Sequence, residues 1–272
     1  MRWSLAIALA VLAVAGRAAA EPPPAPPVPR VLNVPSAHLQ GAGRLFVTAG
    51  GSLVTERDPF AGITFGLGDL ADVDLELHDR VGNCGDCTAE RRAASSIATA
   101  TAGFKVGLPE GRLARWQPAL ALGFRAPIGS RQVAGPDGDR ELRSARMTLM
   151  MSRTLRPLEL HGGAEIWDAS ARGPGGDLYL HDRPLADRLR PYVGLGWNPA
   201  SYPRTWLLAD LSFAPVVDGD AIDMRYTFDW GVRYQVTRWS SIELDVRYRQ
   251  GDELGDTDVL VRANAAIDWF EQ

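Results

Sequence analysis

Apolar and polar residues alternate with a period of two along the stretch 224–249. The apolar positions are Met224, Tyr226, Phe228, Trp230, Val232, Tyr234 and Val236 and, after a short turn, Ile242, Leu244, Val246 and Tyr248. The positions between them carry Arg225, Thr227, Asp229, Gly231, Arg233 and Gln235 and then Glu243, Asp245, Arg247 and Arg249. Because successive side chains of a strand point to opposite faces, this pattern predicts a long antiparallel hairpin with one apolar and one charged face.

The same alternation recurs between residues 43 and 270 and predicts an all-β chain of about twelve strands. Compact turns alternate along the chain with loops that are mostly longer and more polar. The compact turns are 68–71, 109–115, 155–157, 198–204 and 237–240. Short turns at one end and longer loops at the other are typical of an up-and-down antiparallel transmembrane β-barrel, and we predict one single barrel of this kind.

Aromatic residues give a third pattern, because they fall near the expected ends of strands. With the compact turns on the periplasmic side, those at the periplasmic ends are Trp116, Trp197, Tyr202, Trp206, Tyr234, Trp239 and Trp269, and those at the outer ends are Trp167, Tyr226 and Tyr248. Such rings are favoured at membrane interfaces. The alternative is that aromatic residues simply prefer strands; their place at strand ends favours the membrane interpretation.

The first residues have the layout of a cleavable secretory signal. Residues 1–20 carry Arg2, an apolar core at 5–15 and a small-residue site at 18–20, and the core is too short to span a bilayer as a helix. We therefore expect three parts: a signal peptide (1–20), a proline-rich N-terminal segment that is extended rather than folded (21–42), and the barrel (43–270). The predicted location is the outer membrane, and the expected partners are its lipid, its lipopolysaccharide and the barrel-assembly machinery.

Charge and cysteine content exclude some functions. The chain has 29 Lys and Arg against 33 Asp and Glu, which argues against a nucleic-acid-binding surface. Cys84 and Cys87 are the two cysteines, and in an oxidising compartment they predict a small disulfide in a loop. A metal site is the alternative, but two thiols supply only half of a tetrahedral shell. We predict no metal and no cofactor.

The polar face of the strands would line the barrel. By parity, the candidate lining residues are Lys105, Arg125, Arg146, Glu159, His161, Glu165, Arg190, Arg225, Asp229, Arg233, Glu243, Asp245, Arg247 and Arg262. Both signs of charge occur in similar number once the other charged inward positions are included, which are Asp72, Asp74, Glu76, Asp210, Arg249 and Asp268. One interpretation is a self-neutralising network that holds the shape of the barrel; the other is a narrow polar conduit whose selectivity these charges set. Parity does not distinguish an open lumen from a plugged one.

From about residue 43 to 270 the chain resembles the porin-like outer-membrane β-barrels of Gram-negative bacteria. The resemblance rests on the hairpin around Val236-Thr237-Arg238-Trp239 and on the closing strand that ends Ile267-Asp268-Trp269-Phe270. The terminal aromatic of such barrels is similar to the signal read by the assembly machinery, although Glu271 and Gln272 follow it here. Asn33-Val34-Pro35-Ser36-Ala37, with Leu39 and Gly41, resembles the start of barrels linked to exopolysaccharide export.

These observations predict a narrow pore or transport-associated barrel for small polar solutes. One alternative is a non-conducting structural or exopolysaccharide-export-associated surface barrel, and a second is a soluble periplasmic β-sandwich or ligand-binding barrel. An enzyme is not expected, because the chain has no G-x-S-x-G and no H-E-x-x-H motif, and His161 lies with Glu159 and Glu165 at alternate positions of one strand.

Overall fold

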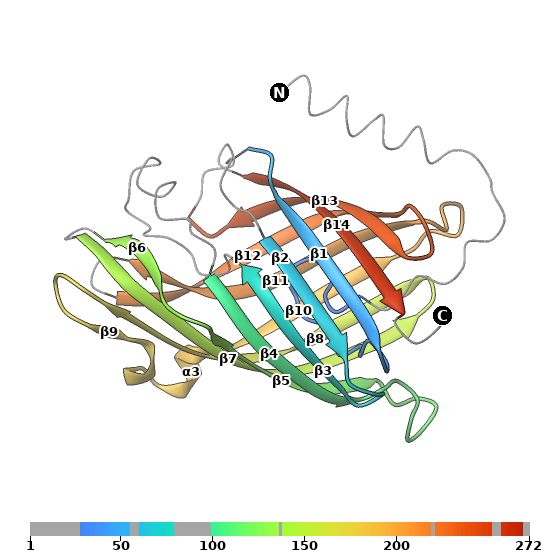
Figure 1. Cartoon of the computed structure of the whole chain (residues 1–272), viewed down its shortest axis with the longest axis horizontal. Helices are drawn as coiled ribbons and strands as arrows, with labels where there is room; N and C mark the ends of the chain where they lie inside the picture. The colour runs from blue at the N-terminus through green and yellow to red at the C-terminus, as the bar shows by residue number, and fades with distance from the viewer. Residues whose placement is uncertain are drawn as a thin grey trace.

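The computed structural model describes residues 28–54, 60–78, 99–135, 138–218, 221–251 and 257–268. These residues form one antiparallel sheet that closes on itself, because β1 pairs with β14 and β7 pairs with β8 (Figure 1). The closed ring has 12 strands, as the alternation predicts. Its members are β1 (Arg44–Ser52), β2 (Phe60–Gly66), β3 (Ala71–His78), β4 (Thr99–Leu108), β5 (Ala119–Pro127), β7 (Gly138–Leu155), β8 (Leu158–Arg172), β10 (Leu189–Trp197), β11 (Thr205–Asp218), β12 (Ala221–Gln235), β13 (Ser240–Arg249) and β14 (Asp258–Asp268).

The predicted hairpin at 224–249 is present as β12 and β13, which pair from Gln235↔Ser241 to Thr227↔Arg249. The compact turns all join strands at one end of the barrel. The connections at the other end are mostly longer, although residues 219–220 alone join β11 to β12 there. Each strand neighbours the next one in sequence around the ring, so the topology is up-and-down. The predicted β-sandwich alternative is wrong, because one closed sheet replaces two packed ones.

Two of the longer polar segments, 129–140 and 168–188, which their composition predicts to be loops, contain regular structure. Within 129–140, β6 (Arg131–Gly135) pairs with the start of β7, and within 168–188, β8 continues to Arg172 and is followed by β9 (Leu178–Tyr179), the 3-10 helix η1 (Leu180–Asp182) and α3 (Leu185–Arg188). The reason is that β7 and β8 stay paired as far as Glu141↔Arg172. The backbone groups that β7 and β8 turn toward each other stay paired there, so glycine and charged residues do not end the strands.

The outside of the ring is apolar. Large side chains that point outward are exposed on every part of the circumference, and they include Ile63, Leu75, Phe104, Leu122, Leu149, Leu160, Val193, Leu207, Trp230, Ile242 and Ile267. The inward positions between them are mainly polar and buried. This is the reverse of a water-soluble protein, in which apolar side chains are the buried ones. In the described part of the chain, none of the helices has the length and the apolar character needed to cross a bilayer.

Candidate functional site

Residues 28–42, here called the plug, precede β1 and lie inside the barrel. Val31, Leu32, Val34 and Ala37 have at most 3% of their surface exposed. The plug is folded back on itself, because the Val31 amide donates to the Val34 carbonyl (2.9 Å) and the chain forms a bridge between Arg30 and Pro35. The expectation of an extended segment is thus wrong for residues 28–42, which fold and pack into the lumen because the wall offers partners for their backbone and apolar side chains.

The plug enters the first strand through two glycines. Gly41 and Gly43 have φ angles of 81° and 70°, in the left-handed region that glycine adopts at little cost. The Gly43 amide donates to the Gly66 carbonyl (3.0 Å) at the compact-turn end of β2. The chain therefore reverses at the periplasmic rim, and the plug projects from there into the lumen.

Asp210 on β11 is the main anchor of the plug. Its Oδ2 atom accepts hydrogen bonds from the backbone amides of Leu32 (3.1 Å), Asn33 (2.7 Å) and Val34 (2.9 Å). The carboxylate is 2% exposed, so these bonds are shielded from water. Hydrogen bonds that involve a charged group are about twice as strong as those between neutral groups, and one carboxylate oxygen here holds three successive amides.

A second group of charges holds the plug from β12, β13 and β14. The Asn33 side chain donates to Asp229 and accepts from Arg247, and Arg247 is also paired with Asp229 (2.8 Å). Arg233 donates to the Val31 carbonyl (2.7 Å), and Arg262 donates to the Leu32 carbonyl. The positive side chains of the wall thus bind plug carbonyls while the negative ones bind plug amides.

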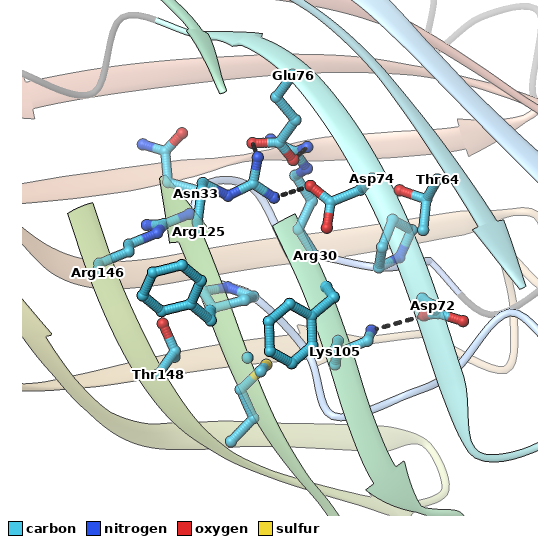
Figure 2. A pocket seen from close by; sticks show the side chains of 16 residues that line it. Arg30, Asn33, Thr64, Asp72, Asp74, Glu76, Lys105, Arg125, Arg146 and Thr148 are labelled. Carbon is cyan, nitrogen blue, oxygen red and sulfur yellow. Dashed lines mark hydrogen bonds and ion pairs between the residues drawn. The ribbon is translucent and has the colours of Figure 1, made fainter. Parts of the chain in front are cut away.

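The opposite wall contributes β3, β4 and β5 (Figure 2). Figure 2 shows Arg30 of the plug and Arg125 directed at the carboxylates of Asp74 and Glu76. Lys105 is paired with Asp72 (3.1 Å) and donates to the His38 carbonyl (2.6 Å), and the Gln40 amide donates to Asp72 (3.1 Å). A cavity of about 60 Å³ remains between the plug and this wall, which is room for only a few water molecules.

Apolar contacts complete the fit. Val34 and Ala37 pack with Ala119, Ala121, Met150 and Tyr192, and Val31 and Leu32 pack with Leu208. Gly194 on β10 leaves space for the plug, because a Cβ atom built there would lie 2.9 Å from Val31 Cγ2 and 3.4 Å from Val34 Cγ1. Plug and wall are therefore complementary in shape as well as in charge.

Ser152, His161 and Glu159 form a chain of side chains below the plug. Ser152 Oγ lies 2.8 Å from His161 Nδ1, and His161 Nε2 lies 3.7 Å from Glu159 Oε2. Ser152 Oγ also accepts a hydrogen bond from the Ala37 amide (2.8 Å), and Ser152 is fully buried. The Ser152 hydroxyl thus helps to hold the plug backbone against β7.

Most of the parity-derived lining residues meet inside the barrel. Arg146 is paired with Glu165 (3.0 Å), and Arg262 is paired with Asp245 (3.0 Å). Glu243 binds Arg233 and accepts from Asn264 (2.9 Å). Together with the contacts described above, the network brings Lys105, Arg125, Arg146, Glu159, His161, Glu165, Asp229, Arg233, Glu243, Asp245, Arg247 and Arg262 to the inner face.

Two predicted lining residues, Arg190 and Arg225, lie toward the outer end of the barrel. Arg190 lies at the beginning of β10 and donates to the Ala186 (2.8 Å) and Leu189 (3.3 Å) carbonyls near α3, and its role as a lining residue stays a prediction. Arg225 lies toward the outer end of β12, beside Gly251. Cys84 and Cys87 fall outside the described residues. Among the residues that are described, no group of three or more His, Cys, Asp or Glu side chains is placed to hold a metal ion.

The sequence analysis missed the plug, and it also missed Asp210 as its anchor. Residues 31–39 lack the alternation of a strand, and the prolines around them favour an extended linker. The available signal was different: the apolar residues Val31, Leu32, Val34 and Ala37 lie close together, shortly before two glycines and a barrel with a charged lining. Apolar residues gathered in this way need a partner surface, and the lumen supplies it.

An apolar cluster packs inside the outer end of the barrel. Inward residues Leu142, Trp167, Ala169 and Ala171 of β7 and β8 pack with Leu180 of η1 and with Val217 and Ile222 at the ends of β11 and β12. The strand β10 begins only at Leu189, so β8 and β11 extend beyond it. The cluster fills the space left above the short strand.

A closed ring satisfies every strand edge, and an apolar exterior around a charged interior is stable only where lipid covers the outside. This chain is an outer-membrane β-barrel protein. No protein-family model and no curated protein matches it.

Several solved outer-membrane proteins are similar to this barrel in structure. The loop L8 deletion mutant of OmpT, an outer membrane protein of Vibrio cholerae, aligns with a TM-score of 0.39 and 14% identity over 80% of this chain and 66% of its own. The translocator domain of the autotransporter NalP from Neisseria meningitidis aligns with a TM-score of 0.38 and 10% identity over 83% of this chain and 88% of its own. Outer membrane phospholipase A from Escherichia coli aligns with a TM-score of 0.39 and 12% identity over 84% of this chain and 90% of its own. Similarity at this level says nothing about function.

Proposed function

We propose that this outer-membrane barrel is a conduit for small polar solutes that its own plug keeps closed until the plug is displaced. The observation that carries the proposal is the way the plug is held. Asp210 alone binds three consecutive plug amides, and Arg233 and Arg262 bind plug carbonyls. The lumen wall therefore uses charged groups where an inert filling would use apolar ones.

Charged groups of this kind can exist in two states. With the plug seated they are satisfied by its backbone, and with the plug displaced they would be satisfied by water and ions in a hydrated lumen. An apolar interface would have no such second state, because opening it would expose hydrocarbon to water. The mixed charges of the wall thus support a lumen that can alternate between closed and open.

The connectivity of the plug supports its displacement without unfolding of the barrel. The plug is one continuous segment, it joins the wall through Gly41 and Gly43, and none of its residues belongs to a ring strand. Its described contacts with the wall are side-chain contacts and not ladder hydrogen bonds. Withdrawal toward the periplasm would leave all 12 strand pairings intact.

Planar-bilayer recording tests the proposal. The full chain should be closed most of the time, because the plug occupies the lumen and is bound to both β11–β14 and β3–β5. A variant that lacks residues 21–40 should give frequent discrete conductance steps. Heat-modifiability on a gel verifies that the variant is a folded barrel. A variant that is folded but electrically silent would contradict the proposal.

The non-conducting structural barrel is the second candidate, and the outer apolar cluster favours it. Leu142, Trp167 and Leu180 pack at the end of the barrel opposite the plug, so removal of the plug alone would leave this cluster in place. The same recording separates the two candidates. Silence of the plug-deleted barrel, together with its normal folding, would make the structural or export-associated role the better account.

A further inference from the structure

Arginine side chains gather at the compact-turn end of the barrel. Four consecutive turns, those that follow β4, β7, β10 and β12, each carry at least one: Arg112, Arg115, Arg156, Arg204 and Arg238. All of these except the half-buried Arg204 are exposed. Because β5 pairs with β7, β8 with β10, and β11 with β12, the four turns are neighbours along one arc of the rim. We call these five residues the arginine arc.

Carboxylates do not balance the arc. Glu110 is paired with Arg153 (3.2 Å), Asp268 with Arg44, and Glu159 with His161 (3.7 Å). Asp69 lies in the turn between β2 and β3, outside the arc. In the described part of the compact-turn end, the arc is thus a surface of uncompensated positive charge. The turns directly follow the lipid-facing strands, so this charge lies at the edge of the apolar exterior.

Exposed apolar and aromatic side chains accompany the arginines. Leu113 and Trp116, in the same turn as Arg112 and Arg115, have 74% and 78% of their surface exposed. The Arg238 guanidinium lies 4.0 Å from the centre of the Trp239 ring. Large apolar side chains that sit beside cations at the edge of a lipid-facing band fit the boundary between acyl chains and headgroups.

We propose that the arginine arc binds the phosphate headgroups of anionic phospholipid, of the phosphatidylglycerol type, in the periplasmic leaflet. Guanidinium groups match phosphate in geometry and remain charged at every physiological pH. The compact turns of a transmembrane barrel face the periplasm, so the arc meets phospholipid at that side. Trp116 and Leu113 enter the acyl region below the headgroups that the arginines hold.

Lipid preference of the reconstituted full chain tests the proposal. The protein is placed in vesicles of phosphatidylcholine with a minor fraction of phosphatidylglycerol, extracted gently, and the retained lipids are counted by native mass spectrometry. Each arginine near an anionic surface contributes roughly a fivefold preference. The double variant R112Q/R115Q should therefore lose about 10- to 30-fold of the preference for phosphatidylglycerol. The matched control is R143Q/R172Q, which removes two exposed arginines from β7 and β8 at the outer end.

Four outcomes decide between the proposal and its alternatives. Loss of the preference in R112Q/R115Q with retention in R143Q/R172Q supports the proposal. An unselective wild-type protein overturns it, and so does an equal loss in both variants, which would assign the preference to net charge. Retention of the wild-type protein on isolated peptidoglycan without any lipid preference would overturn it in favour of the cell wall. Heat-modifiability of each variant verifies that it is folded, and R112K/R115K, which keeps the charge, should restore most of the preference.

Discussion

The substitution Asp210→Asn removes the charge that holds the plug and keeps the size of the side chain. Asp210 Oδ2 accepts three plug amides at 2.7–3.1 Å, and the residue is 2% exposed. Asparagine keeps one acceptor oxygen, so the amides still have a partner, but a neutral one. We predict that the barrel folds normally and that the plug is displaced far more often.

The size of the effect follows from the difference between the two kinds of hydrogen bond. A bond to a charged group contributes about 1.5–3 kcal/mol, and one between neutral groups about 0.5–1.5 kcal/mol. Three bonds that each weaken by about 1 kcal/mol sum to about 3 kcal/mol, if they are taken as additive. Since 1.4 kcal/mol is tenfold in an equilibrium constant, plug displacement should rise roughly 100-fold.

Chemical labelling of the plug measures this equilibrium. Ser36 is 1% exposed, so a thiol introduced by Ser36→Cys, with Cys84 and Cys87 replaced by Ser, reacts with a water-soluble maleimide only when the plug leaves the wall. Labelling should be about 100-fold faster with Asp210→Asn. The matched control is Asp258→Asn, which is equally buried but is paired with Arg249 (2.7 Å) on the neighbouring strand. Equal labelling rates in parent and Asp210→Asn, or equal acceleration by Asp258→Asn, would refute the reasoning.

Three further predictions follow from the same structure. Burial, and after it the charge of a nearby His161, lowers the pKa of His38. The neutral His38 ring therefore stabilises the seated plug at pH values above the ordinary histidine pKa of about 6.5. This stabilisation is lost as the pH falls toward the lowered pKa. Labelling of the Ser36→Cys thiol, corrected for the pH dependence of the maleimide reaction, should therefore accelerate from pH 7.5 to 5.5, and His38→Gln should abolish that component. Gly194→Leu should push the plug away from β10, because the added side chain would occupy the space of Val31 and Val34. Labelling of the Ser36→Cys thiol should then be faster at neutral pH. A labelling rate equal to that of the parent would mean that the plug does not lie against β10. Leu149→Arg lies in the middle of the apolar band and should lower the free energy of unfolding in lipid by about 2–4 kcal/mol, as measured by urea titration. Leu155→Arg lies at the strand end and should lower it by about 0–1 kcal/mol. Equal decreases in the two variants would argue against a bilayer around the band.

The fold could be predicted because a period of two is a local property of the sequence. Trp230 and Val232 point outward while Asp229 and Arg233 point inward, and this difference is readable without any knowledge of the partner strand. The compact turns are readable for the same reason. The extra pairing of β6 and the extension of β8 were not, because a strand that lies beyond the membrane no longer needs one wholly apolar face.

The site could be predicted only in part, because it depends on contacts between residues far apart in the chain. Parity assigns Arg233 and Glu243 to the same face, but it does not show that Arg233 also binds the carbonyl of Val31, some 200 positions earlier. Asp210 is one inward carboxylate among several in the sequence. Its role appears only when the plug amides are seen to converge on it.

Arg190 illustrates the limit of parity at a strand end. The alternation of β10 places Arg190 among the inward positions, but α3 comes immediately before it, and the Arg190 guanidinium donates to the Ala186 carbonyl. Parity gives the direction of the Cβ atom, whereas a nearby acceptor determines where the end of a long, flexible side chain lies. Residues near the middle of strands, such as Asp229 and Asp245, have no such local alternative and follow parity.

A reversible lock on the plug tests the central claim most directly. The Ala37 amide lies 2.8 Å from Ser152 Oγ, so the pair Ala37→Cys and Ser152→Cys can form a disulfide that fixes the plug to β7. Conductance is recorded from this pair combined with Asp210→Asn, with Cys84 and Cys87 replaced by Ser, before and after addition of a reductant. The account predicts a silent barrel in the oxidised state and discrete conductance steps once the disulfide is reduced. Identical recordings in the two states would contradict the claim that the plug closes the conduit.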